Sequence, residues 1–258
     1  MKSLSLEEFN DKMKALLLTD ELASFVAQDS LSNGLQSRGK DEIQTIGFGV
    51  SANMKLFEMA KKAGCDAIVV HHGINMQAPN LDRLSYERLA YLIKNDITLW
   101  SSHFLLDAHP ELGHPAQIIK LLDGRRTEAY LSDGAPWGSV GELQNGSTLE
   151  SVVATLKPHF SERTVVYDDG PDEVKRIVVA TGAGAPYSSG MDELMDKGID
   201  LFITGEAREW NRDLFREAGI HFIAGGHYHS EAFGVRAVQK EAEKWGLNTL
   251  WLDAENPL

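Results

Sequence analysis

The sequence predicts an α/β protein made of two lobes, each with a mainly parallel sheet. Short apolar runs alternate with longer amphipathic segments, a pattern typical of βαβ units whose strands are covered by helices. With 258 residues, the chain is long enough for two modest cores. Near Arg125 the pattern changes, because glycine and proline interrupt short β-like runs before a second α/β series begins. We therefore expect lobes at residues 1–125 and 126–258.

The first lobe is expected to open with an amphipathic helix over residues 5–18. Leu6, Phe9 and Met13 fall on one face of that helix. Later elements follow from the same helical and strand periodicities. They are strand 43–50, helix 53–63, strand 67–70, helix 86–95, strand 97–100 and helix 115–122.

The second lobe repeats this alternation. Turn-forming glycines separate short β-like runs up to Gly146, and helical and strand patterns then alternate again. The expected elements are helix 148–156, strands 164–167 and 176–180, helix 191–197, strand 201–204, helix 211–218, strand 221–224, helix 231–244 and strand 250–252.

Composition excludes several classes of protein. A formal charge of −13 disfavours a nonspecific grip on nucleic acid, which needs clustered lysine and arginine. The single cysteine, Cys65, excludes an internal disulfide framework and a cysteine-rich zinc module, and we expect it in a core. No run approaches the roughly 18 apolar residues that span a membrane. The first residues also lack the pattern of a signal peptide, so we expect a cytoplasmic protein.

Eight of the nine histidines fall into three short windows, and only His159 lies outside them. His71-His72, His103 with Asp107, and His227 with Glu231 each come after an expected strand, and ligands of open α/β sheets gather beyond the carboxyl ends of strands. The windows are His71-His72-Gly73, His103 to His114 with Asp107 and His109 between them, and His221 to Glu231 with His227 and His229.

These windows predict a metal site, because imidazole and carboxylate are natural ligands of zinc, iron, manganese, cobalt and nickel. Together they offer more ligands than the three that a catalytic zinc takes from its protein, so we expect two divalent ions. Gly73 frees the backbone for both rings of the His71-His72 pair to face one site. His227 and Glu231 share a helical face at i and i+4.

Each feature alone also has an ordinary structural interpretation. An adjacent histidine pair commonly has one ring in the core and one in solvent, and Glu231 could simply cap a helix. Glu206 fits three roles equally: orienting a histidine ligand, acting as a general base, or capping the next helix. The loop 181–185 could present backbone amides to an anion, although a tight strand-to-helix turn is more usual.

At these windows the sequence resembles the Nif-three-like (NGG-interacting factor three-like) family, often labelled GTP cyclohydrolase type I, type 2 homologues. The resemblance extends over nearly the whole chain. It rests on the order and spacing of Asn33-Gly34-Leu35-Gln36, His71-His72, His103 to Ala108, Ile203 to Glu206, and Gly226 to Glu231. The sequence departs from the family pattern at Gly73, at Phe104-Leu105 and at His114, where proline, Thr-Asn and asparagine are usual.

The resemblance implies a dinuclear metal centre between the two lobes and a toroidal homohexamer. It implies that Glu231 bridges both ions. It also implies that His103 is a further polar residue at the site, either supporting the ligands or acting as a proton shuttle. Carried over by position, the implied metal ligands are His71, His72, Asp107, His227 and Glu231.

Two divalent ions about 3.5–4 Å apart would polarise an electrophile and lower the pKa of a bridging water. We therefore predict a metal-dependent hydrolase acting on a small molecule, either a nucleotide or a phosphoester. A GTP-cyclohydrolase-like ring opening is suggested by the family label alone. His103, His229 and Glu206 are the candidate acid–base groups. The alternatives are a non-catalytic metal-binding or regulatory scaffold, and a metal-free nucleotide-binding protein that uses the loop 181–185.

Overall fold

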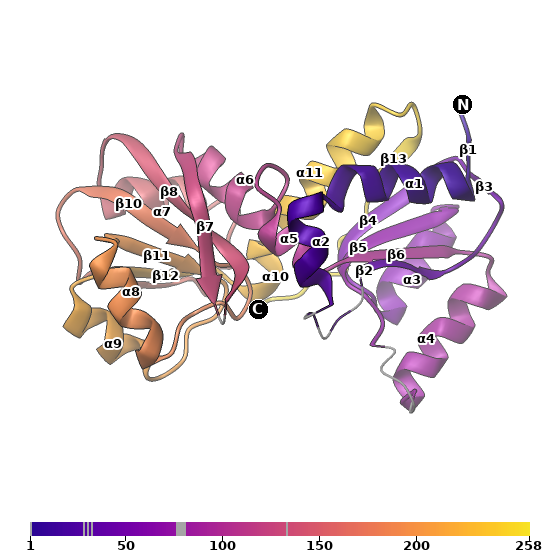
Figure 1. Ribbon diagram of the computed structural model, residues 1–258. Helices are drawn as coiled ribbons and strands as arrows, with labels where there is room; N and C mark the ends of the chain where they lie inside the picture. Colours follow the sequence, from indigo (N-terminus) through magenta and orange to yellow (C-terminus); the bar gives the residue numbers. More distant parts are fainter. Residues whose placement is uncertain (1, 28, 30, 32, 76–80, 133) are drawn as a thin grey trace. The chain divides into compact units, whose positions relative to one another are not determined.

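The computed structural model describes residues 2–27, 29, 31, 33–75, 81–132 and 134–258 (Figure 1). They form two compact units. The first unit is Met1–Leu106 with Val235–Glu255, and the second unit is Asp107–Gly234 with Asn256–Leu258. Parallel strands form the centre of the sheet in each unit, which confirms the predicted α/β class.

These units differ from the predicted lobes 1–125 and 126–258 in two respects. Helix α6 (His114–Leu121) belongs to the second unit, because Ile118 and Ile119 pack into that unit's core. Strand β13 (Asn248–Trp251) belongs to the first unit, because it pairs in parallel with β4 (Thr45–Ser51). The chain passes between the units within α5 (Phe104–Ala108), within α11 (Ala232–Glu243) and again after Glu255. The sequence shows no linker at the crossings inside the two helices.

In the described part of the first unit, the main sheet has the order β13-β4-β5-β6-β2. The strands β5 (Ala67–His72) and β6 (Thr98–Ser102) continue the parallel set, and β2 (Asn33–Ser37) pairs antiparallel with β6. A short ribbon joins β1 (Leu4–Ser5) to β3 (Glu42–Ile43). The helices are α1 (Leu6–Leu17), α2 (Asp20–Val26), α3 (Met54–Lys62) and α4 (Arg83–Lys94).

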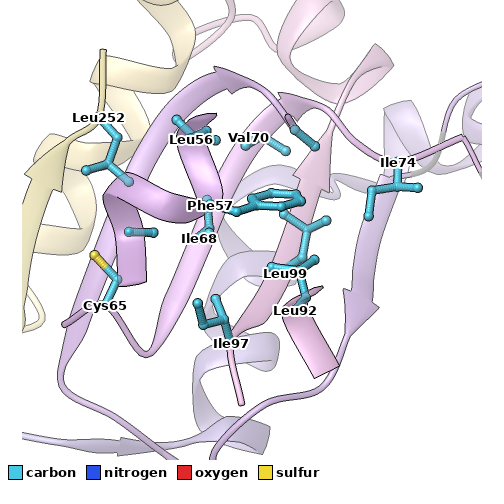
Figure 2. Close-up of a cluster of buried hydrophobic side chains, with 12 residues drawn as sticks. Leu56, Phe57, Cys65, Ile68, Val70, Ile74, Leu92, Ile97, Leu99 and Leu252 are labelled. Carbon is cyan, nitrogen blue, oxygen red and sulfur yellow. The ribbon is translucent and has the colours of Figure 1, made fainter. Parts of the chain in front are cut away.

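The first unit's core explains why its central strands read as continuous apolar runs. Residues of β5 and β6 are buried on both faces, as expected for a covered parallel sheet. Figure 2 shows Phe57 of α3 and Leu92 of α4 packed against Ile68 and Leu99. Cys65 lies in the same cluster, as predicted, and burial, with the nearby Asp66 charge, raises the pKa of its thiol to about 11.

In the described part of the second unit, the sheet has the order β7-β8-β10-β11-β12-β9. Its parallel centre is β10 (Val174–Val179), β11 (Leu201–Thr204) and β12 (His221–Ala224). The flanking strands β7 (Arg125–Ser132), β8 (Ala135–Ser147) and β9 (Val165–Tyr167) pair antiparallel.

Alternate residues of these parallel strands pack on opposite faces of the second unit's sheet. Ile177 and Leu201 join one cluster with α6 and α7 (Leu149–Leu156), whereas Val178 and Phe202 join another with α8 (Met191–Asp196) and α9 (Asn211–Ala218). Helices therefore cover both faces, and the loops at the carboxyl ends of the strands carry the polar residues. No helix in the described part of the chain combines the length and apolarity needed to cross a membrane.

Candidate metal centre

His71 and His72 are the last two residues of β5, so the prediction that they follow the strand is corrected by two residues. Pairing with β6 ends at Val70, whereas pairing with β4 continues two residues further, to His72, which pairs with Ser51. Because the ladder on one side has already ended, the two rings need not face opposite sides of the sheet. Their centroids lie 4.5 Å apart, which fits the expected convergence.

Three histidines of the first unit use the same ring nitrogen for an orienting contact. His71 Nδ1 lies 2.8 Å from the carbonyl oxygen of Ser102, and His72 Nδ1 lies 2.9 Å from the hydroxyl of Ser51. His103 Nδ1 faces a carboxylate. When Nδ1–H donates in such contacts, the lone pair of the ring is on Nε2. One ligand atom from each of the three rings lies within 4.8 Å of the others, so these histidines can hold an ion.

The carboxylate that faces His103 belongs to Asp29, which the sequence analysis did not identify. Its side chain is 1% exposed, and both oxygens lie 3.0 Å from His103 Nδ1. Burial by itself raises the pKa of Asp29, but bonds from His103, Leu31 N–H and Phe104 N–H lower it to about 2. Asn33 Nδ2 donates a further bond of 2.7 Å. Asp29 is therefore a buried, charged partner that fixes the His103 ring.

The motif around Gln36 supports the backbone just after the histidine pair. Gln36 Oε1 accepts from Ile74 N–H at 2.9 Å, and its Nε2 donates to Ile74 O at 2.7 Å. A Cβ on Gly73 would lie 2.1 Å from Gln36 Oε1 and 2.8 Å from the Cβ of Ser101. A larger residue at 73 would therefore displace the Gln36 side chain or Ser101.

Phe104 and Leu105, the apolar departures from the family pattern, are 1% and 2% exposed. The Phe104 ring centroid lies 6.2 Å from that of Phe25 in the same unit. The backbone N–H of Phe104 donates to Asp29, and that of Leu105 to Asn33 Oδ1. These two side chains therefore pack inside the protein.

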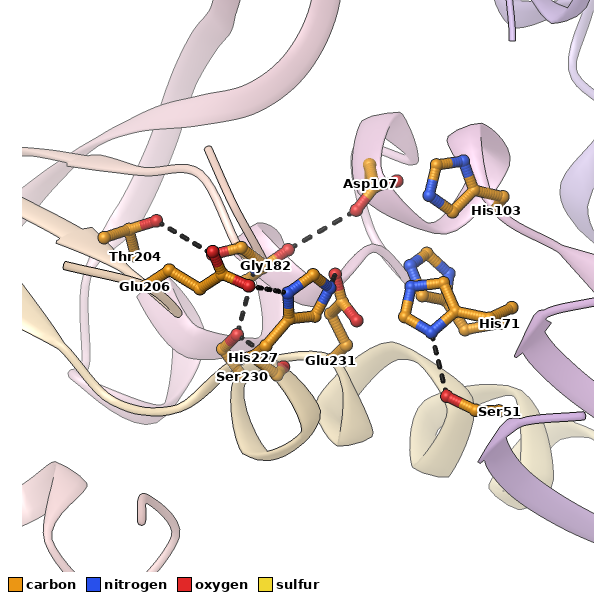
Figure 3. Close-up of polar contacts among 12 residues, drawn as sticks. Ser51, His71, His103, Asp107, Gly182, Thr204, Glu206, His227, Ser230 and Glu231 are labelled. Atoms are coloured by element: carbon orange, nitrogen blue, oxygen red, sulfur yellow. Dashed lines mark hydrogen bonds and ion pairs between the residues drawn. The ribbon is translucent and has the colours of Figure 1, made fainter. Parts of the chain in front are cut away.

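In the second unit, His227 is held between two glutamates (Figure 3). It begins α10 (His227–Ser230), directly after β12 and Gly225-Gly226. Its Nδ1 lies 2.6 Å from Glu206 Oε1, and its Nε2 lies 3.1 Å from Oε1 of Glu231, which is 3% exposed. Burial alone lowers the pKa of His227, but the bonds and charges of Glu231 and Glu206 raise it to about 9.

The contacts of His227 indicate which of its expected roles Glu206 has. The contact of His227 with Glu231 also fits the i, i+4 spacing expected of these two residues. Of the three roles weighed for Glu206, the hydrogen bond to His227 Nδ1 is that of an orienting group. Helix α9 has no side-chain cap, so Glu206 does not cap it. In the metal-free protein a proton on His227 Nε2 links this ring to Glu231, and a divalent ion would replace that proton.

The loop after β10 supports the His227–Glu231 pair. Gly182 N–H donates to Ser230 Oγ at 3.1 Å, and Gly182 O accepts from Glu206 N–H at 2.9 Å. Gly182 has φ +59°, and a Cβ there would lie 2.2 Å from Glu231 Oε1 and 3.0 Å from His227 Nε2. The backbone of Gly182, which could have met an anion, is thus engaged within the site.

Asp107, the fifth expected ligand, lies in α5 and is 6% exposed. Thr181 Oγ1 donates to Asp107 Oδ1 at 3.4 Å within the second unit. The expected ligands are therefore divided between the units, with His71 and His72 in the first and the other three in the second. Their joint coordination of two ions stays a prediction.

Three other histidines show the opposite hydrogen-bond pattern. In each, Nδ1 accepts a backbone N–H, so the neutral ring carries its proton on Nε2. They are His109, which accepts from Glu111 and Leu112, His114, which accepts from Gly234, and His221, which accepts from Gly170.

His229 has a different environment from His227. Its Nδ1 is buried and has no hydrogen-bond partner among the described residues. It lies 3.0 Å from where a Cβ of Gly226 would be. His229 thus takes no part in the hydrogen bonds that join Glu206, His227 and Glu231, and its acid–base role stays a prediction.

The donor atoms in both units fit divalent metal ions. Each unit presents imidazole Nε2 atoms at the carboxyl end of a parallel strand, and the second unit adds buried carboxylates. Hydrogen bonds at Nδ1 fix the rings, as is usual for histidine ligands. In the second unit, His227 Nε2 and Glu231 Oε1 lie close enough together to share one ion.

Residues 12–257 match the Duf34/NIF3 (NGG1p interacting factor 3) family. The chain is 36% identical over 263 aligned positions to the "GTP cyclohydrolase 1 type 2 homolog" of Salmonella typhimurium and to that of Escherichia coli K12, covering all of each chain. A solved structure described as "protein ybgI, unknown function" is 32% identical, with a TM-score of 0.84 and coverage of 99% of this chain and 100% of the other.

A second solved structure, TTHA1606 from Thermus thermophilus, is 28% identical with a TM-score of 0.82, over 99% of this chain and 100% of that one. The match to the family thus extends over both units and includes every residue of the candidate site. With relatives above 30% identity over their full length, the chain belongs to the Duf34/NIF3 (NGG1p interacting factor 3) family.

Proposed function

We propose that this protein is a metal-dependent hydrolase that acts on a nucleotide or another phosphoester. In this proposal two divalent ions are bound by residues from both units: His71, His72, Asp107, His227 and Glu231. The name shared by the bacterial relatives, "GTP cyclohydrolase 1 type 2 homolog", supports a nucleotide as the substrate class.

The observation that carries the proposal is the shared orientation of the histidines. The Nδ1 atom of His71 contacts Ser102 O, and the Nδ1 atom of His227 contacts Glu206. In both units Nε2 is therefore the nitrogen that would coordinate an ion. Histidines held for structural reasons elsewhere in the chain, such as His221, show the reverse pattern. A ring held at Nδ1 by a carbonyl or carboxylate, with Nε2 directed to the ion, is the usual arrangement of histidine metal ligands.

The protein's own groups would do the following at this site. Bound divalent ions would supply Lewis acidity and make water nucleophilic near neutral pH. His103 would accept and return a proton at Nε2, while the buried Asp29 carboxylate holds its Nδ1–H and stabilises the protonated ring. Glu206 would keep the His227 ring in place.

The first test is elemental analysis of the purified, untagged protein beside a His71→Ala/Glu231→Ala double variant. We expect about two divalent ions per chain in the parent and their loss in the variant. His159→Ala is the matched control, because His159 is an exposed histidine outside the three windows. Circular dichroism confirms that each variant is folded. Low metal content that reconstitution cannot raise, equal in parent and double variant, would contradict the proposal.

The His103→Ala variant distinguishes the enzyme from the alternative, a non-catalytic metal-binding scaffold. If the protein is an enzyme, this variant keeps its metal and loses turnover of GTP or p-nitrophenyl phosphate. A parent protein that holds both ions and turns over no compound from a panel of nucleotides and phosphoesters would favour the scaffold.

A further inference from the structure

The second unit contains a cavity of about 370 Å³ beside His227 and Glu206. This volume lies within the roughly 300–1,000 Å³ range of small-molecule sites. Its lining includes Gly205, which follows β11, and Ala224, which ends β12, at the carboxyl ends of strands where ligands of α/β sheets collect. The lining also includes Ser161, Arg163, Val165 and Pro257.

The cavity wall carries an arginine whose charge is not neutralised. The guanidinium of Arg163 is exposed and makes no ion pair or hydrogen bond with any residue that the structure describes. Four other arginines of this unit are held by carboxylates, and two by hydroxyl groups, Arg126 by Ser139 and Arg208 by Tyr187. The four carboxylate pairs are Arg125 with Glu142, Arg176 with Glu128, Arg212 with Asp169 and Arg216 with Asp213. In a chain of net charge −13, a cation left without a carboxylate beside a cavity indicates an anionic ligand.

The same lining also carries a carboxylate. Glu206 lines the cavity and uses Oε1 to hold His227. Its negative charge would repel an anionic group of a ligand. Glu206 would accept a hydrogen bond from an N–H or O–H group instead. Val165, Ala224 and Pro257 add apolar surface to this lining.

We infer that this cavity binds a small molecule with an oxyanion at one end, paired with Arg163, and a hydrogen-bond donor at the other, directed at Glu206. The apolar walls hold the body of the molecule between these ends. Calling this molecule the substrate rests on the proposed function, whereas its binding does not.

The test uses two small aromatic probes, 4-aminobenzoate and 4-aminophenylphosphonate, which carry the amine donor and differ in the oxyanion. Binding is measured by isothermal titration calorimetry with the metal-loaded protein and again after chelation. Arg163→Met should weaken binding of the preferred probe about 10-fold or more, because a charge-assisted hydrogen bond is lost. Aniline, which has no oxyanion, should bind the parent and Arg163→Met equally.

Arg216→Met is the control, because it removes an exposed arginine of the same unit that lies outside the cavity. It should leave the affinity of both probes unchanged. Equal affinity in the parent and Arg163→Met, or no binding of either probe to the parent, overturns the inference. If binding disappears on chelation and is the same in the parent and Arg163→Met, the anion binds the metal ions. That result supports the proposed function and rejects this cavity as the anion site. Binding through Arg163 that survives chelation supports the cavity even if no hydrolase activity is found.

Discussion

A histidine ligand binds through one ring nitrogen, and the partner of the other nitrogen decides which one is available. At His71 that partner is a backbone carbonyl, at His103 a buried carboxylate, and at His227 Glu206. At His227 burial alone lowers the pKa, but the bonds and charges of Glu231 and Glu206 outweigh it and raise the pKa of this ring to about 9.

Asp66 gives a prediction about acid stability away from the metal site. Its side chain is 11% exposed; Oδ2 accepts from the N–H groups of Gln44 and Thr45, and Oδ1 from Lys40 Nζ. Burial alone raises the pKa of Asp66, but these hydrogen bonds outweigh it and lower the pKa. A lowered folded-state pKa contributes stability above the unfolded pKa of about 3.9, and this contribution is lost as the pH falls through the folded value.

Asp66→Asn should therefore lower the free energy of unfolding by about 1–3 kcal/mol at pH 7, with the difference from the parent shrinking at pH 3. Urea denaturation at both pH values measures this. Asp41→Asn is the control, because Asp41 is exposed and should change stability little. Equal stability of the parent and Asp66→Asn at pH 7 would show that these bonds contribute nothing.

For single residues, the sequence could predict candidate metal ligands but not the groups that hydrogen-bond to them. The windows at His71 and His227 were recognisable because histidine and carboxylate recur at short spacing. Asp29 was missed because it has no neighbouring motif and reaches His103 across 74 residues of sequence. Such a contact depends on the pairing of β2 with β6, which brings distant segments together.

The loop between β10 and α8 provides a prediction for a structural element. Gly182→Ala should weaken zinc binding about 10-fold or more, because the new methyl group would displace the Glu231 carboxylate. Gly198→Ala is matched to it: Gly198 has a similar φ of +62°, but no atom lies within 4 Å of its Cβ position. Both variants should cost about 1–2 kcal/mol of stability from the left-handed backbone. Competition with a chromogenic chelator measures the affinity, and equal zinc binding in the two variants would contradict the prediction.

Helices and strands with clear periodicity were predicted within a few residues. The helix expected at 211–218 is α9 (Asn211–Ala218), and the strands expected at 201–204 and 221–224 are β11 and β12. The strand β2 and the helix α2 were not predicted. Strand β2 reads Asn-Gly-Leu-Gln-Ser, which has neither an apolar run nor alternation, and it forms only because β6 offers an edge for pairing.

For the whole molecule, family resemblance leads us to propose a homohexamer. Multi-angle light scattering of the metal-loaded protein should give a mass of six chains. Exposed apolar side chains such as Leu84, Tyr86 and Ile93 of α4 are available for contacts between chains. A mass of one chain at micromolar concentration would reject the hexamer and leave the metal site as proposed.

The division of the whole chain into two units could not be predicted from its composition. The change of pattern near Arg125 is real, but it reflects the start of the antiparallel β7–β8 pair within the second unit. The boundary itself lies inside α5, where no glycine- or proline-rich linker marks it.

The pairing of β13 with β4 has a consequence for the order in which the protein folds during synthesis. The second unit is made from one nearly continuous stretch, so most of its contacts can form as the chain leaves the ribosome. The first unit's sheet must wait for Asn248–Trp251, which pairs with a strand made about 200 residues earlier. Until then, one edge of β4 is open to pairing with other chains. The nascent protein is therefore most vulnerable to aggregation through its earliest-made unit, late in translation.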